Sequence, residues 1–129
     1  MALGHTSYAE AGQLYQQALS IYRQIGDALG EANCLQSLGE VALRRSRCAQ
    51  ALQFYQEALA IHRQIGARLG EANCVQRIGD VARTEARYAE AGALYKQALP
   101  IFRQIGDWRV KLVATGQRPS WPNSNATST

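Results

Sequence analysis

Hydrophobic residues recur along the chain at three- and four-residue spacing, which places them on one face of an α-helix. Two runs of this kind are copies of each other: Leu35, Leu38, Val41 and Ala42, then Val75, Ile78, Val81 and Ala82. Good helix formers such as alanine, leucine, glutamine and arginine dominate the composition. The pattern predicts an all-α fold of about five helices, over Tyr8–Ile25, Ala28–Arg44, Cys48–Ile65, Arg68–Arg83 and Tyr88–Ile105.

The whole pattern repeats with a period of 40 residues. Ile21–Gly26 returns at 61–66 and again at 101–106, and Leu29–Cys34 returns unchanged at 69–74. Residues 8–47 and 48–87 agree at roughly 23 of 40 positions. A repeat this short cannot bury its own apolar face, so neighbouring repeats must stack into an array.

Glycines mark the end of the second helix of each repeat. Gly26, Gly66 and Gly106 follow that helix directly, where a glycine adopts the left-handed conformation without a steric penalty. Asp27 is the expected N-cap of the next helix. Ala67 stands at the same position of the second repeat and predicts a cap that is weaker by about 1 kcal/mol.

Other recurring residues are expected to pack the repeats together. Gly39 and Gly79 lie inside predicted helices, where glycine costs roughly 1 kcal/mol against alanine, so they predict a close approach between helices. Core packing is expected for the tyrosines Tyr15, Tyr55 and Tyr95. An ion pair between repeats, or a favourable charge at a helix C-terminus, is expected for the arginines Arg23, Arg63 and Arg103.

The third repeat is incomplete. Asp107 is in position to begin another first helix, but the residues after it depart from the pattern at once. Pro100 lies inside the last predicted helix and predicts a kink or fraying there. We therefore divide the chain into a helical repeat domain over 1–107 and a divergent, disordered tail over 108–129. The tail either folds back over the last helix or stays loose.

Composition and charge exclude several classes of protein. The formal net charge is +4 and the arginines are dispersed through the repeats, so the basic footprint of a nucleic acid-binding protein is weak. No stretch is long and apolar enough to cross a membrane, and residues 1–8 do not resemble a signal peptide. We expect a cytoplasmic protein.

The residue types needed for catalysis or for a metal site are not brought together by the sequence. Cys34 and Cys74 are equivalent residues of successive repeats and are expected to be small buried hydrophobic side chains. A zinc site needs four ligands at short spacing, and only two histidines are present. Cys48 and His62 would lie about 21 Å apart along one helix. Because no phosphate loop, catalytic carboxylate pair or triad is present, we expect no enzyme activity and no cofactor.

The recurring residues resemble the packing positions of the tetratricopeptide repeat. They are Leu35, Leu38, Gly39, Ala42, Ala51, Tyr55, Ala58 and Leu59 in one unit, and Val75, Ile78, Gly79, Ala82, Ala91, Tyr95, Ala98 and Leu99 in the next. The resemblance covers residues 8–107, and the 40-residue period is longer than the usual repeat of about 34. This longer form is similar to the repeats of Pins-type polarity adaptors. The resemblance implies a right-handed α-solenoid of antiparallel helix pairs that binds other proteins.

In that family the first helices line a concave groove for an extended peptide. Carried over by position, the groove residues are Asn33, Gln36, Glu40, Leu43 and Arg44, then Asn73, Gln76, Asp80, Arg83 and Thr84. Asparagine and glutamine both donate and accept hydrogen bonds, so they can pair with a peptide backbone of any sequence. The acidic residues and the arginines, which include Arg77, favour a ligand that also carries both signs of charge.

Two interpretations of function remain. In the first, the chain is a scaffold or adaptor that binds a peptide or a helix of a partner protein in this groove. In the alternative, it is a structural unit of a longer array, or a self-associating unit, without a ligand of its own. Stable arrays need about three repeats and polar caps, and here both ends are second helices.

Overall fold

The structure is a computed structural model and describes residues 7–116 of the chain. It consists of five helices: α1 (Tyr8–Ile25), α2 (Ala28–Arg44), α3 (Cys48–Ile65), α4 (Arg68–Thr84) and α5 (Tyr88–Thr115). No strand occurs within these described residues. The prediction of an all-α fold with about five helices is therefore confirmed.

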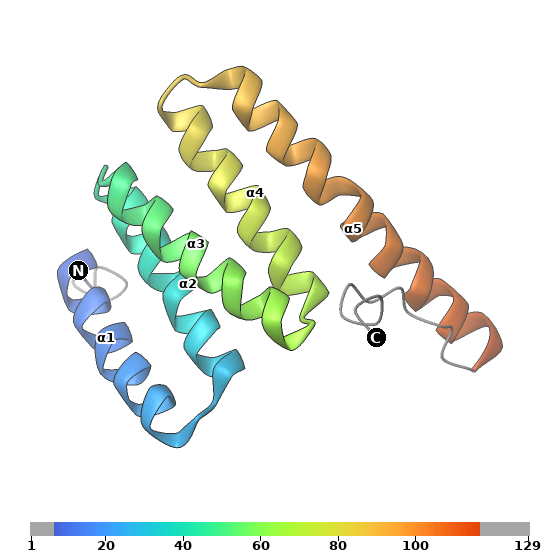
Figure 1. Cartoon of the computed structure of the whole chain (residues 1–129), viewed down its shortest axis with the longest axis horizontal. Helices are drawn as coiled ribbons and strands as arrows, with labels where there is room; N and C mark the ends of the chain where they lie inside the picture. The colour runs from blue at the N-terminus through green and yellow to red at the C-terminus, as the bar shows by residue number, and fades with distance from the viewer. Residues whose placement is uncertain (1–6, 117–129) are drawn as a thin grey trace, which may run out of the picture.

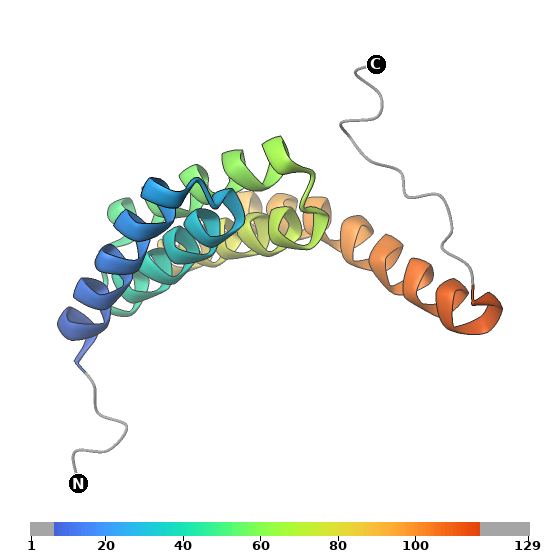
Figure 2. The same ribbon diagram turned by 90° about the horizontal axis from the view of Figure 1, so that it is seen from below.

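The helices lie in chain order, and each packs against the next (Figure 1). The tightest packing is within the pairs α2–α3 and α4–α5, which are the two complete repeats. Figure 2 shows that the array is curved, with α1 and α3 on the outer side of the arc and α2 and α4 on the inner side. The right-handed sense of the expected solenoid stays a prediction.

The first two turns between repeats form as the sequence predicts. Gly26 and Gly66 are left-handed, with φ of 75° and 73°. The side chain of Asp27 accepts a hydrogen bond of 2.9 Å from the backbone N–H of Gly30 and so caps α2. Ala67 cannot make this bond, and α4 begins without a side-chain cap.

The buried cysteines belong to the hydrophobic core. Cys34 and Cys74 pack in a cluster with Leu35, Leu38 and Ala58, next to Leu19 of α1. Burial raises the pKa of both thiols, that of Cys74 to about 12, so both stay protonated at neutral pH. Their predicted role in packing is confirmed.

Aromatic rings lie on helix glycines throughout the array. The ring of Tyr55 covers Gly39 and the ring of Tyr95 covers Gly79, which confirms the predicted close approach of paired helices. Core packing is confirmed for Tyr55, which is 1% exposed, but is wrong for Tyr15, which is 37% exposed. Among the described residues no helix glycine lies under the Tyr15 ring, unlike the rings of Tyr55 and Tyr95.

A second set of ring contacts closes the turns between repeats. The ring of Tyr22 leaves no room for a Cβ atom at Gly30, and the ring of His62 leaves none at Gly70. In each case an aromatic residue near the end of one helix lies against the first turn of the next. These contacts let the chain fold back sharply after each second helix.

Ion pairs reinforce the same two turns. Arg23 Nε lies 3.1 Å from Glu31 Oε2, and Arg63 Nε lies 3.3 Å from Glu71 Oε2. The predicted pairing between repeats is thus confirmed for two of the three arginines. Arg103 forms no ion pair with the described residues, because Lys111 stands where the other repeats have glutamate.

The prediction that the last helix ends at Ile105 is wrong. α5 is helical through Pro100, where fraying was expected, and continues past Gly106 to Thr115. The reason lies in residues 110–112. The equivalent residues of the first two repeats, 30–32 and 70–72, are Gly-Glu-Ala. At 110–112 the sequence is Val-Lys-Leu, so the glycine under the aromatic ring, the acid for the arginine and the fully buried alanine are all missing.

Without those contacts a returning helix cannot pack, and the chain continues straight. The proposed division of the chain at 107 and 108 therefore falls within a helix, although the domain limits themselves stay a prediction. Most of the segment for which we expect disorder, residues 117–129, lies outside the described residues.

Candidate functional site

The predicted groove residues form two rows on the helices at the inner side of the arc (Figure 2). One row follows α2 with Asn33, Gln36, Glu40 and Arg44, and the other follows α4 with Asn73, Gln76, Asp80 and Arg83. In each row half of the side chains are exposed and half are partly buried. Leu43 instead packs partly against the core, and the Thr84 hydroxyl donates to the backbone oxygen of Asp80.

A pocket of about 310 Å³ lies between these helices. Its lining residues are Asn33, Gln36, Ser37 and Glu40 of α2, Tyr55 of α3 and Arg77 of α4. The structure thus brings together three of the five predicted residues of α2. All five predicted residues of α4 lie outside the lining, and Arg77 represents that helix in the pocket.

The charged side chains on this face form a connected network of ion pairs. Arg77 lies 3.7 Å from both Glu40 Oε1 and Asp80 Oδ2 and so bridges α2 and α4. Arg44 pairs with Glu40 at 3.3 Å, and Arg83 pairs with Asp80 at 3.7 Å. The arginine side chains are 46–63% exposed, so each pair contributes only about 0–1 kcal/mol. A ligand with charges of both signs can therefore replace these pairs at small cost.

Two tyrosines at equivalent positions differ in their hydrogen bonds. The Tyr95 hydroxyl donates to Asp80 Oδ1 at 2.5 Å, whereas the Tyr55 hydroxyl is buried and has no hydrogen-bond partner among the described residues. Glu40 stands where the next repeat has Asp80, but its carboxylate pairs with arginines instead. Burial is the largest cause that raises the pKa of Tyr55 to about 12, so the hydroxyl keeps its proton. The pocket wall therefore contains an unused hydrogen-bond donor.

His62 is a residue of this region that sequence analysis missed. It is 1% exposed, and its Nε2 lies 2.6 Å from Oε1 of Gln36. Because the glutamine oxygen can only accept, Nε2 carries the proton. Burial lowers the pKa of His62, although the nearby charge of Glu71 acts in the opposite direction. The Gln36 oxygen is thus already used inside the protein, and only its amide N–H groups are left for a ligand.

The α1–α3 part of the array matches a known family. Residues 6–64 match the tetratricopeptide repeat. The match spans α1, α2 and nearly all of α3, and α4–α5 repeat the sequence of α2–α3, so a tetratricopeptide repeat family is supported. Such repeats generally mediate protein–protein interactions and are typically non-enzymatic scaffolds. No curated protein sequence matches the chain significantly.

Two further observations bear on the kind of site. Across residues 7–116, none of the helices combines the length and apolar character that a membrane span requires. In the same part of the chain, no three side chains of His, Cys, Asp or Glu lie together as a set of metal ligands.

Proposed function

We propose that this chain is a scaffold that binds an extended peptide, or a helix, of a partner protein along the face formed by α2 and α4. The single observation that carries the proposal is the Tyr55 hydroxyl, a buried donor without a partner in the wall of a polar pocket. Buried polar groups in proteins nearly always have a partner, and an unpaired one needs an explanation. A carbonyl oxygen of a bound peptide would supply that partner once the pocket side chains that cover the hydroxyl move aside.

The other pocket residues fit the same ligand. The amide groups of Asn33 and Gln36 reach a peptide backbone, which offers donors and acceptors at regular spacing whatever its sequence. Glu40 of α2 and Arg77 of α4 give the pocket one charge of each sign, 3.7 Å apart. Charges of both signs on the ligand would then fix its direction across α2 and α4.

Several finer features belong to this proposal. We infer that the repeats are of the long form seen in Pins-type adaptors, that the solenoid is right-handed and that the groove is its concave face. The 40-residue period and the curvature in Figure 2 support these inferences. We also propose a cytoplasmic location, no enzyme activity and no nucleic acid partner.

The experiment begins with a library of displayed twelve-residue peptides, from which binders of the purified wild-type chain are selected. The selected peptides are then titrated by fluorescence anisotropy against Tyr55→Phe. We expect binding to weaken about five- to tenfold, because one buried hydrogen bond is lost. The fold should be unharmed, because the removed hydroxyl has no partner in the free protein.

The matched control is Tyr95→Phe, whose hydroxyl is already bonded to Asp80. This variant should bind the peptides within about twofold of wild type while losing some stability. The double variant Asn33→Ala with Asn73→Ala should also weaken binding. The double variant Gln53→Ala with Gln97→Ala, on α3 and α5 and outside the pocket lining, should not. Equal affinities in all four variants would refute the proposal.

A second candidate function is self-association or stacking within a longer array. On α3, Phe54 and Ile61 pack against the core, but Leu14 and Ile21 at the same positions of α1 are 61% and 56% exposed. The exposed apolar stripe of α1 could therefore be covered by a further helix that packs against α1 as α2 packs against α3. Sedimentation at several concentrations tests this candidate, since a monomer at all of them counts against self-association.

A further inference from the structure

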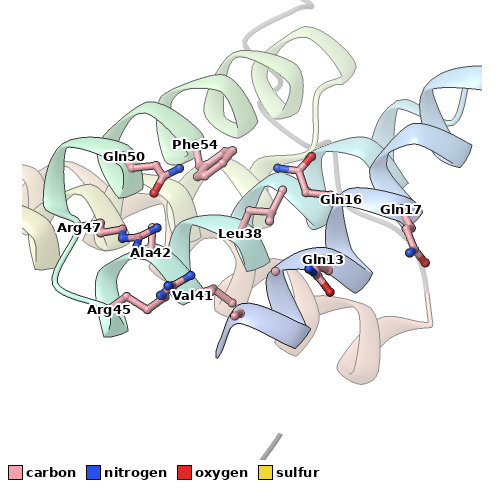
Figure 3. Close-up of a pocket in the computed structure, with 12 residues that line it drawn as sticks. Gln13, Gln16, Gln17, Leu38, Val41, Ala42, Arg45, Arg47, Gln50 and Phe54 are labelled. Atoms are coloured by element: carbon pink, nitrogen blue, oxygen red, sulfur yellow. The ribbon is translucent and has the colours of Figure 1, made fainter. Parts of the chain in front are cut away.

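A larger pocket, of about 690 Å³, lies on a different face of the array, between α1 and α3 and above α2 (Figure 3). Its floor is apolar and includes Leu38, Val41 and Phe54. Its walls carry four glutamines, Gln13, Gln16 and Gln17 of α1 and Gln50 of α3. Figure 3 shows the side chains of Arg45 and Arg47 together at one end of the pocket. None of these residues belongs to the face of the proposed function.

A glycine keeps this pocket open. A Cβ atom added to Gly12 would meet only Val41 Cγ1, at 3.9 Å, so the space above the glycine is free. The equivalent residue of the next repeat is Leu52, which is partly buried and packs against the core cluster of Ala42 and Tyr55. The leucine of the second repeat thus packs into the core, whereas the glycine of the first repeat leaves the space above it open.

The two grooves also differ in charge. No carboxylate of the described residues pairs with Arg45 or Arg47. One repeat later the corresponding positions are Glu85 and Arg87, and Arg87 is bound by Glu85 at 2.5 Å and by Glu90 at 3.1 Å. Arg45 and Arg47 therefore keep their full charge, whereas Arg87, the one arginine at the equivalent positions of the next repeat, is neutralised from within the chain.

We propose that the groove between α1 and α3 is a second binding site, which takes an acidic, extended segment of a partner protein. Carboxylates of the segment pair with Arg45 and Arg47, since arginine binds carboxylates through two parallel hydrogen bonds. An apolar side chain of the segment fills the space above Gly12. The glutamines pair with its backbone, because each amide both donates and accepts.

The same observations disfavour a nucleic acid as the ligand. Among the described residues only two arginines line the groove, and binding of a single strand relies on several basic side chains with aromatic rings on which successive bases stack. Phe54 is the single aromatic residue that residues 7–116 contribute to the lining. An acidic peptide with an apolar side chain matches both the charge and the apolar floor.

The site is tested on the full chain with a capped ten-residue peptide of glutamate and glycine around a central leucine. Titration by fluorescence anisotropy compares wild type with Gly12→Leu and Arg45→Glu, which copy Leu52 and Glu85 of the next repeat and so suit the fold. We expect each variant to bind at least about tenfold more weakly than wild type. Circular dichroism establishes that both variants stay helical.

The matched control is Arg103→Glu, which changes the net charge by the same amount on α5, away from the groove. It should leave the affinity within about twofold of wild type. The proposal is overturned if this control weakens binding as much as Arg45→Glu, or if wild type does not bind the acidic peptide better than its lysine version.

Two other occupants are tested in parallel. Binding of a ten-nucleotide oligothymidylate that is lost in Gly12→Leu, without binding of the peptide, would show a nucleic acid site and overturn the proposal. Wild-type dimers in sedimentation that dissociate in Gly12→Leu, again without peptide binding, would show that a second copy fills the groove.

Discussion

A β-carbon placed on Gly39 would stand 2.6 Å from Cε1 of the Tyr55 ring, so only glycine lets α2 and α3 approach this closely. Gly79 and Tyr95 form the same contact one repeat later, at 2.8 Å. Tyr55 is 1% exposed, so its ring is enclosed by the core on all sides. The helix therefore keeps a residue with poor helix propensity because the packing of the repeat depends on it.

Substitution of Gly39 by alanine is expected to lower the free energy of unfolding by about 1–2 kcal/mol. Overpacking against the tyrosine costs about 1–3 kcal/mol, and the better helix propensity of alanine returns up to about 1 kcal/mol. Urea denaturation measures the difference. Gly92→Ala is the matched control, because a Cβ there meets nothing within 4 Å in α5. It should stabilise the protein by up to about 1 kcal/mol. If both variants gain stability equally, the ring contact does not constrain Gly39.

Glu71→Gln is expected to destabilise the protein by about 1–2 kcal/mol. The Glu71 carboxylate accepts from Arg68 at 3.0 Å and from Arg63 at 3.3 Å, and its side chain is only 11% exposed. Hydrogen bonds to charged groups in such surroundings are stronger than exposed ion pairs. Glu31→Gln is the comparison, since this carboxylate is more exposed and its loss should cost about 0.5 kcal/mol. Thermal unfolding of the two variants in the same buffer decides whether the predicted order is right.

The parts of the fold that depend on local sequence could be predicted, and the parts that depend on a distant partner could not. The helices, the left-handed turns and the Asp27 cap each follow from a few neighbouring residues. The end of α5 could not be predicted in the same way. It depends on whether residues 110–112 can pack against Phe102 and Arg103 across the turn.

The candidate site shows the same division. The row on α2 follows from helical spacing and the resemblance to a repeat family. The charge of Arg77 was expected from the sequence, but its place in the pocket and that of Tyr55 depend on how neighbouring helices are placed, which spacing along one helix does not reveal. The bond between Gln36 and His62 joins residues 26 positions apart, and a lone histidine on a helix gives no signal of it.

Protonation of His62 makes stability depend on pH. Burial lowers the pKa of this histidine in the folded protein below its ordinary value of 6.5, so the unfolded chain binds the proton more readily. The contribution of His62 is therefore fully present above about pH 6.5 and is lost as the pH falls below that value toward the folded pKa. Urea unfolding between pH 7.5 and 5.5 should show this loss in wild type. It should be smaller in His62→Tyr, which copies Tyr22 over Gly30. Identical slopes in the two proteins would exclude His62 as the source.

Replacement of Val110, Lys111 and Leu112 by glycine, glutamate and alanine is expected to break α5 at Gly106 and fold its last turns back. The triple variant restores the glycine under the aromatic ring, the acid opposite Arg103 and the small buried residue that the first two turns share. Gly106 is already in place to adopt the left-handed conformation. Proton NMR detects the change, because the α-protons of the introduced glycine would shift upfield above the Phe102 ring and show contacts to it. Lys111→Glu alone restores the ion pair without making room for the ring and should keep α5 straight. If the triple variant also keeps a continuous helix, the contacts at these three positions do not decide where the chain turns.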